Sequence, residues 1–105
     1  MAHSNPHSPT ALGGAQRKWL RGQAHALRPI VQVGGSGLSQ AVLSAVDQAL
    51  LAHELIKVRL VQPEDKKAAA QELAERSGAE LCGLVGHTVI LYRPHPEEPK
   101  LELPK

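Results

Sequence analysis

The chain has 105 residues, which is the size of one domain with one modest hydrophobic core. Its 42% hydrophobic content is ordinary for a soluble globular protein, and its single cysteine, Cys82, excludes an intrachain disulfide and fits a reducing cytoplasm. No apolar stretch approaches the roughly 20 residues that cross a bilayer, and residues 1–10 lack the pattern of a secretory signal. We therefore expect a soluble cytoplasmic protein with no membrane partner.

The net charge of +2 is unevenly distributed along the chain. The part before Asp47, the first acidic residue, carries +4, whereas the remainder, with 8 basic and 10 acidic residues, carries −2. The four early charges are Arg17, Lys18, Arg21 and Arg28. Clustered cations without neutralising neighbours attract polyanions through phosphate contacts. A solvated helix face would have the same composition, so this second interpretation stays open.

The first half of the chain predicts a helix, a strand and a second helix. Residues 1–14 lack periodic apolar positions and predict a flexible lead-in. Residues 15–26 combine an apolar stripe with a basic face, as an amphipathic helix does. Pro29 ends the helix, and the β-branched residues 30–33 predict a strand that stops at a glycine-rich turn. A second helix with apolar residues at every fourth position follows, and Ser39 is its expected cap.

The second half predicts a strand, a third helix and a hairpin. Residues 53–60 alternate apolar and charged side chains, which predicts a half-buried strand whose charged face looks toward solvent. Residues 63–78 predict a helix that ends at a glycine, and residues 79–85 and 88–92 predict the two arms of a hairpin. Prolines then begin an irregular tail at residues 95–105, in which a short strand at residues 100–103 is an option.

Together these elements predict an α/β fold with the order α-β-α-β-α-β-β. We expect a two-layer sandwich with a mixed sheet of about four strands. The domain proper would cover residues 15–94, between the lead-in and the proline-rich tail.

The turn between the first strand and the second helix reads Gly34-Gly35-Ser36-Gly37. The dinucleotide motif G-x-G-x-x-G fails because Gln40 occupies its third glycine, and the lysine of a Walker loop is missing. What remains is G-x-x-G, the loop with which KH-type proteins hold an RNA backbone. A purely structural turn that requires positive φ explains these four residues equally well.

Catalytic and metal-binding patterns are not found. The two aspartates, the buried-looking cysteine and the six scattered histidines form no nucleophile motif and no metal-ligand spacing. We therefore expect neither an enzyme nor a cofactor. Aromatic residues amount to Trp19 and Tyr92, too few for a base-stacking platform, so recognition should depend on phosphates and shape.

Four blocks of sequence, in this order, resemble the CRM (chloroplast RNA splicing and ribosome maturation) domain family in its single-domain, bacterial YhbY-like form. They are Leu20-Arg21-Gly22-Gln23-Ala24-His25-Ala26-Leu27-Arg28-Pro29, Val33-Gly34-Gly35-Ser36-Gly37-Leu38, His53-Glu54-Leu55-Ile56-Lys57-Val58-Arg59 and Gly86-His87-Thr88-Val89-Ile90-Leu91-Tyr92-Arg93-Pro94. The resemblance covers the chain from about residue 16. It implies an α/β fold similar to the C-terminal domain of bacterial translation initiation factor three, and a non-catalytic role with precursors of the large ribosomal subunit.

The resemblance also implies a set of RNA-binding residues. Its loop corresponds to Gly34, Gly35, Ser36 and Gly37, and its basic surface to Arg21, Arg28, Lys57 and Arg59. To these the charge pattern adds Arg17 and Lys18. Because Gly35 and Ser36 are neutral, we expect the loop to act through backbone N–H groups.

The expected partner is RNA, in particular a large-subunit ribosomal RNA precursor, with ribosomal proteins as further candidates. We expect a monomer. The alternative is a protein-interaction module that docks on a ribosomal protein or assembly factor, with a purely structural glycine turn.

Overall fold

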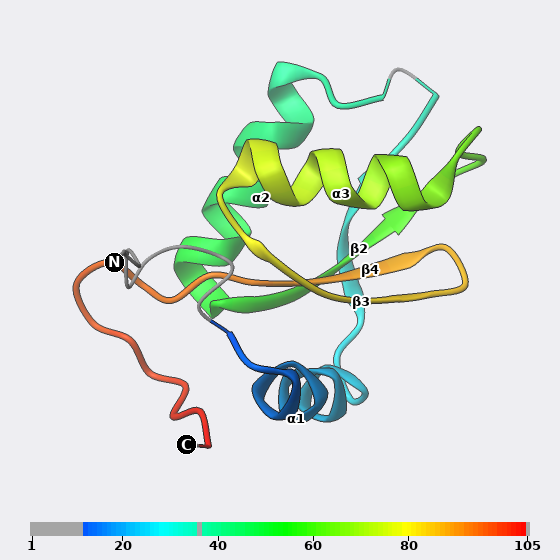
Figure 1. The fold of residues 1–105 in the computed structure, drawn as a ribbon. Coiled ribbons are helices and arrows are strands. Elements are labelled where there is room, and N and C mark those ends of the chain that lie inside the picture. The colour runs from blue at the N-terminus through cyan, green and yellow to red at the C-terminus, as the bar shows by residue number, and fades with distance from the viewer. Residues whose placement is uncertain (1–11, 36, 105) are drawn as a thin grey trace, which may run out of the picture.

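The computed structural model describes residues 12–35 and 37–104. Within that part of the chain lie three helices and four strands, and the sheet has the order β1-β2-β4-β3 (Figure 1). Strand β1 runs parallel to β2, whereas β4 is antiparallel to both β2 and β3. The elements are α1 (Gly14–Ala24), β1 (Pro29–Val33), α2 (Gln40–His53), β2 (Leu55–Leu60), α3 (Lys66–Ser77), β3 (Glu80–Val85) and β4 (Thr88–Tyr92). The α/β fold, the element order and the mixed four-stranded sheet are confirmed.

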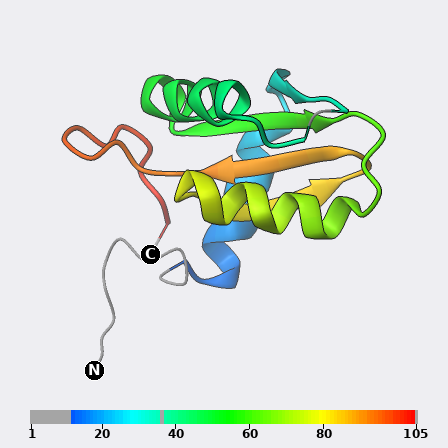
Figure 2. The ribbon, with the colours of Figure 1, turned by 90° about the horizontal axis from the view of Figure 1, so that it is seen from above.

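The helices cover both faces of the sheet, so the layers number three where the sequence predicts two. Helices α2 and α3 lie side by side on one face, and α1 lies on the other (Figures 1 and 2). The cause is that the central strands carry apolar side chains on both faces. Ile56 and Val58 pack under α2 and α3, whereas Leu55, Ile90 and Tyr92 pack with Leu20 and Ala24 of α1.

This third layer also changes the environment of the charged face of β2. The sequence predicts that Lys57 and Arg59 look toward solvent together. Arg59 is exposed, but Lys57 is half-buried because the end of α1 lies over it. The charged side chains of β2 therefore lie beside a helix and not on an open face of the sheet.

The ends of α2 and α3 follow from side-chain chemistry that the sequence displays. The Ser39 hydroxyl accepts a hydrogen bond from the Val42 amide at 3.2 Å, and the Asp65 carboxylate accepts one from the Ala68 amide at 3.1 Å. Each satisfies an amide that has no partner within its own helix. Helix α3 stops at Gly78, which adopts φ +67°, a conformation that glycine reaches without steric cost.

Exchanging Gly78 for alanine should therefore destabilise the fold by about 1 kcal/mol, because a Cβ is strained at this φ. The matched control is Gly22→Ala in α1, where no atom lies within 4 Å of the new Cβ and φ is ordinary. That control should stabilise the fold by about 0.5–1 kcal/mol. Urea unfolding measures both, and a shift of the same sign in the two variants would contradict this assignment.

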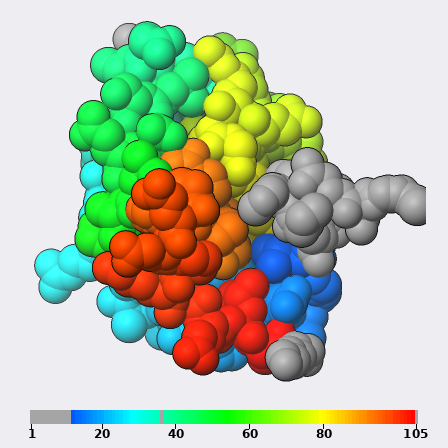
Figure 3. Space-filling view, turned by 90° about the vertical axis from the view of Figure 1, so that its left-hand side faces the viewer, coloured from blue at the N-terminus to red at the C-terminus, as the bar shows by residue number. Residues whose placement is uncertain are grey.

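The proline-rich tail is tied to the domain by one buried carboxylate. Glu54 caps α2 with φ +64° and is only 3% exposed. Its carboxylate accepts hydrogen bonds from the amides of His95, Lys100 and Leu101 at 2.8–2.9 Å. The tail then runs from the end of α2 to α1 (orange to red in Figure 3), where Leu103 packs on the cluster under α1.

The short strand considered at residues 100–103 does not form, because two of its amides bind the Glu54 carboxylate instead of a neighbouring strand. Of the expected lead-in, residues 1–11 lie outside the described residues, and α1 begins at Gly14. In the part of the chain described here, no helix combines the length and the apolar character required to cross a membrane.

Candidate nucleic-acid interface

A groove with a volume of about 670 Å³ lies between α1 and the sheet. Three of the predicted site residues, Lys18, Arg21 and Lys57, line it, together with His25. None of its lining residues is acidic; the others are Gly22, Pro29, Val85, Thr88 and Ile90. We call this the basic groove. It brings together charges from α1 and β2 that are more than thirty residues apart in the chain.

Arg59 extends the basic groove along β2. It is two residues beyond Lys57, which places both side chains on one face of the strand. Its partner on β4 is Thr88, which lines the groove. Arg59 and Lys18 are both exposed, and neither side chain is hydrogen-bonded to another described residue. Their cationic ends are therefore available to a ligand.

Two other cations of the predicted site hold α1 in place. Arg17 forms an ion pair with Glu80, a residue of β3 that is 6% exposed. This pair anchors the start of α1 to the edge of the sheet. Because its guanidinium is paired with a carboxylate, Arg17 contributes less positive charge to a binding surface than the sequence suggests.

Arg21 lies flat across β3 before it reaches the groove. Its Nη1 donates to the Cys82 carbonyl at 2.9 Å, and its side chain passes over Gly83. A Cβ at position 83 would stand 2.8 Å from Arg21 Cδ and 3.1 Å from Cγ. A residue larger than glycine at this position would displace the Arg21 side chain from its path.

We expect Gly83→Val to lower the free energy of unfolding by about 1–3 kcal/mol, because the added methyl groups overlap Arg21 and displace it from the Cys82 carbonyl. Chemical denaturation measures the loss. In a matched variant, Gly83→Val with Arg21→Ala, removal of the overlapping side chain should restore part of it. Equal stability of Gly83→Val and the wild-type chain would contradict the close approach of Arg21 to β3.

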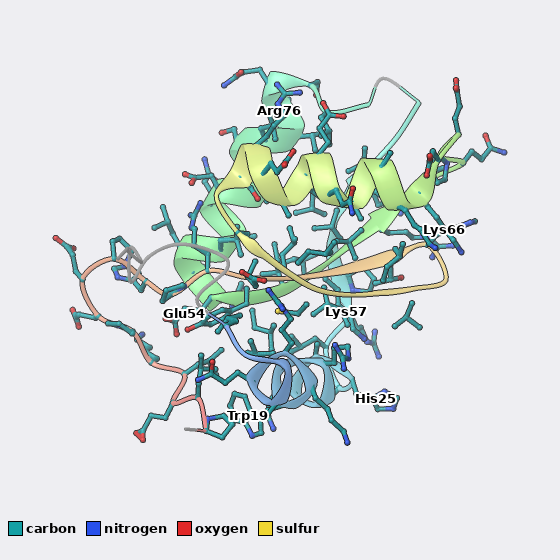
Figure 4. All side chains as sticks on the ribbon, in the orientation of Figure 1. Trp19, His25, Glu54, Lys57, Lys66 and Arg76 are labelled. Carbon is teal, nitrogen blue, oxygen red and sulfur yellow. The ribbon has the colours of Figure 1, made fainter. Side chains whose placement is uncertain are left out.

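Lys57 closes the end of α1 from the sheet side. Its Nζ donates to the carbonyls of Leu27 at 3.1 Å and His25 at 3.5 Å, which are unpaired groups at the helix end (Figure 4). A cation at a helix C-terminus is also favoured by the helix dipole. Lys57 and His25 therefore meet at one point of the basic groove, although they are far apart in the sequence.

The glycine turn follows the end of β1, close to the part of the basic groove that Arg59 extends. Pro29 at the start of β1 lines the groove, and the β1 partner of Arg59 is Gln32, two residues before Gly34. Gly37 has φ +72° and donates its amide to the Gly34 carbonyl at 3.0 Å, which closes the turn. Gly34 and Gly35 are exposed, and Ser36 lies outside the described residues.

The turn thus meets the structural requirement for positive φ and also leads into α2. The first turn of α2 contains no acidic residue, and its amides lie at the positive end of the helix dipole. The amide of Gly37 is already used within the turn. An anion would therefore meet the start of α2 rather than a ring of loop amides.

Arg28 is the predicted site residue that the fold separates from the others. It lines a second groove that shares no residue with the basic groove.

Cys82 is buried under α1, and burial raises the pKa of its thiol to about 12, so it remains a protonated core residue.

The sequence reasoning missed three cationic or titratable positions. His25 was not among the predicted site residues, but it lines the basic groove. Lys66 and Lys67 begin α3 at the end of the sheet that carries the hairpin turn, and both are exposed (Figure 4). The net charge of −2 in the second part of the chain obscured these two lysines.

Comparison with known proteins now gives the family. A family model for the CRS1 / YhbY (CRM) domain matches residues 12–93. The chain belongs to this family. The CRM domain is 39% identical over 98 residues to a protein of Haemophilus influenzae named "RNA-binding protein". The aligned residues cover 91% of this chain and 98% of that protein.

A second relative and a solved structure are also similar to this chain. The chain is 40% identical over 95 residues to "Probable RNA-binding protein YqeI" of Bacillus subtilis, covering 89% of this chain and 99% of that protein. The solution structure of the hypothetical protein SAV1595 from Staphylococcus aureus superposes with a TM-score of 0.78 at 37% identity, covering 89% of this chain and 99% of that one. The resemblance to YhbY-like CRM proteins is thus confirmed.

Proposed function

We propose that this CRM domain binds RNA and that the basic groove is its principal phosphate-binding surface. The observation that carries the proposal is the convergence of Lys18, Arg21, Lys57 and Arg59 on one carboxylate-free groove. Such a surface is attracted to a phosphate backbone and gains free energy from released counterions. The names of the chain's relatives from Haemophilus influenzae ("RNA-binding protein") and Bacillus subtilis ("Probable RNA-binding protein YqeI") support the same function.

The mechanism that fits this surface is backbone recognition without base stacking. Trp19 packs against the cluster under α1, and Tyr92 is 5% exposed, so neither presents a free ring. In our proposal, phosphates of one strand occupy the basic groove, and the backbone continues past Arg59 toward Gly34, Gly35 and the start of α2. Lys66 and Lys67 would attract the strand beyond the turn. Arg17 acts indirectly, by positioning α1.

The cellular role that we propose is assembly of the large ribosomal subunit in the cytoplasm. The bound RNA would be a precursor of large-subunit ribosomal RNA, and the protein would act by binding alone. Sedimentation of the chain with large-subunit precursor particles tests this role. Co-sedimentation that disappears when the basic groove is altered supports it, and co-sedimentation that is indifferent to the groove contradicts it.

Fluorescence anisotropy with a labelled hairpin from large-subunit ribosomal RNA tests the binding mode. Four phosphate contacts predict that the logarithm of the association constant falls against the logarithm of salt concentration with a slope of about −2.8 to −3.6. The slope depends on contact number and not on the identity of the hairpin. A slope near zero would contradict the phosphate model.

A further inference from the structure

The second groove, which contains Arg28, is apolar and lies beside the open edge of the sheet. Its volume is about 320 Å³. Two of its apolar residues are unusually exposed, Leu27 at 39% and Ile30 at 52%. The remaining lining residues are Gln23, His53, Leu55, Ile56 and Leu101. We call it the edge groove, because Ile30 belongs to the edge strand β1.

The outer edge of β1 has no strand beside it in the described part of the chain, since β1 pairs only with β2. An open edge presents unpaired N–H and C=O groups, which can bind another extended chain. Pro29 has no N–H and blunts the first position, so the stretch from Ile30 to Val33 remains. This stretch is adjacent to the exposed apolar side chains of the edge groove.

The charge of the edge groove selects for an acidic occupant. The exposed Arg28 and His53 line it, and none of its lining residues is a carboxylate. A partner segment with an aspartate or glutamate would place its charge against Arg28. Electrostatic complementarity of this kind sets partner choice and association rate.

The protein's own tail shows which kind of segment this side of the molecule accepts. Leu101 lines the edge groove, while its amide is held by Glu54. Leu101 and Leu103 both pack against the cluster under α1, and the exposed Glu102 lies between them. The tail thus docks as an irregular Leu-Glu-Leu segment with alternating inward and outward side chains.

We propose that the edge groove docks an extended segment of a partner protein, with large apolar residues at alternate positions and at least one acidic residue, which adds to β1 as a further strand. Main-chain hydrogen bonds to residues 30–33 would supply affinity. The groove between Leu27 and Ile30 would accept an apolar side chain, and Arg28 would pair with the acidic one. This surface is separate from the basic groove, so a partner protein and RNA could be bound at once.

Selection of 12-residue random peptides displayed on phage against the immobilised full chain tests the proposal. We expect enriched sequences with apolar residues at i and i+2 and an aspartate or glutamate nearby. An enriched peptide, synthesised and labelled, should bind the Ile30→Glu variant about 10-fold more weakly or worse, because a buried charge would face its apolar anchor. The matched control is Ala45→Glu on the exposed side of α2, which adds the same charge away from the groove and should bind normally.

Backbone NMR of the full chain with that peptide should shift the amides of residues 30–33. Leu27→Ser gives a second test if Ile30→Glu fails to fold. The proposal is overturned if no peptide is enriched, if enriched peptides bind both groove variants normally, or if the shifts lie elsewhere. It is equally overturned if a hairpin RNA or a second copy of the chain shifts these amides instead of the peptide. RNA affinity of Ile30→Glu should stay within about twofold of the wild-type value, which separates this test from that of the proposed function.

Discussion

A chain that carries both Lys18→Glu and Arg59→Glu is expected to bind hairpin RNA at least about 25-fold more weakly at 0.1 M salt. The estimate follows from the loss of two phosphate contacts, each of which contributes about −0.7 to −0.9 to the log–log salt slope. The slope should become less steep by about 1.4–1.8. Anisotropy titrations at several salt concentrations measure both quantities.

These two positions are chosen because their side chains are exposed and bind no other described residue, so the fold should tolerate their reversal. Arg21 and Lys57 are less suitable, since both hold the backbone near α1. The matched control is Arg28→Glu with Lys100→Glu, which changes the net charge equally; both residues are exposed and neither lines the basic groove. If the control weakens binding as much, the effect is one of net charge, and the groove assignment is wrong.

Exchanging Glu54 for glutamine is expected to lower the free energy of unfolding by about 2–4 kcal/mol. The buried carboxylate accepts three amide hydrogen bonds, and each bond to a charged group contributes about 1.5–3 kcal/mol. A neutral amide weakens them and sets an N–H₂ group against amide donors. Thermal and urea unfolding measure the loss. Glu98→Gln, which removes an exposed charge from the same tail, should change stability by less than about 0.5 kcal/mol.

The same carboxylate predicts how stability depends on pH. Burial of Glu54 raises its pKa, but the hydrogen bonds from His95, Lys100 and Leu101 and the charge of His95 outweigh burial, so the pKa lies below the ordinary 4.5. A lowered pKa stabilises the fold above the unfolded value and ceases to do so as the pH falls through the folded value. The stability difference between the wild-type chain and Glu54→Gln should therefore be largest at neutral pH and shrink below about pH 4.5. A difference that does not change with pH would contradict a charged Glu54.

Most of the secondary structure could be predicted because local signals agree with the fold. Ser39 and Gly78 are cap residues that mark their helix ends, and the alternation around Val58 defines a strand. The side of the sheet that α1 occupies could not be predicted, because Leu55 and Ile90 read as part of ordinary strands. The hydrogen bonds from the tail to the Glu54 carboxylate could not be predicted from the sequence either. Its three partners are backbone amides up to 47 residues away, and backbone groups leave no pattern in the sequence.

The candidate site was predicted in its composition but not in its arrangement. Charge counting identified Lys18 and Arg21, and the resemblance to the CRM family implied Lys57 and Arg59. The sequence could not show that Arg17 forms an ion pair with Glu80, or that Arg28 lies in a different groove. Both follow from where α1 ends and how it crosses the sheet. His25 was undervalued for the same reason.

The most direct test of the central claim is an NMR titration of the isotope-labelled chain with hairpin RNA at 0.1 M salt. The account predicts that the largest amide shifts lie along the basic groove, at Lys18, Gly22, Arg59 and Thr88, with smaller shifts at Gly35 and the start of α2. Shifts confined to other surfaces, with these groove amides unmoved at saturation, would contradict it.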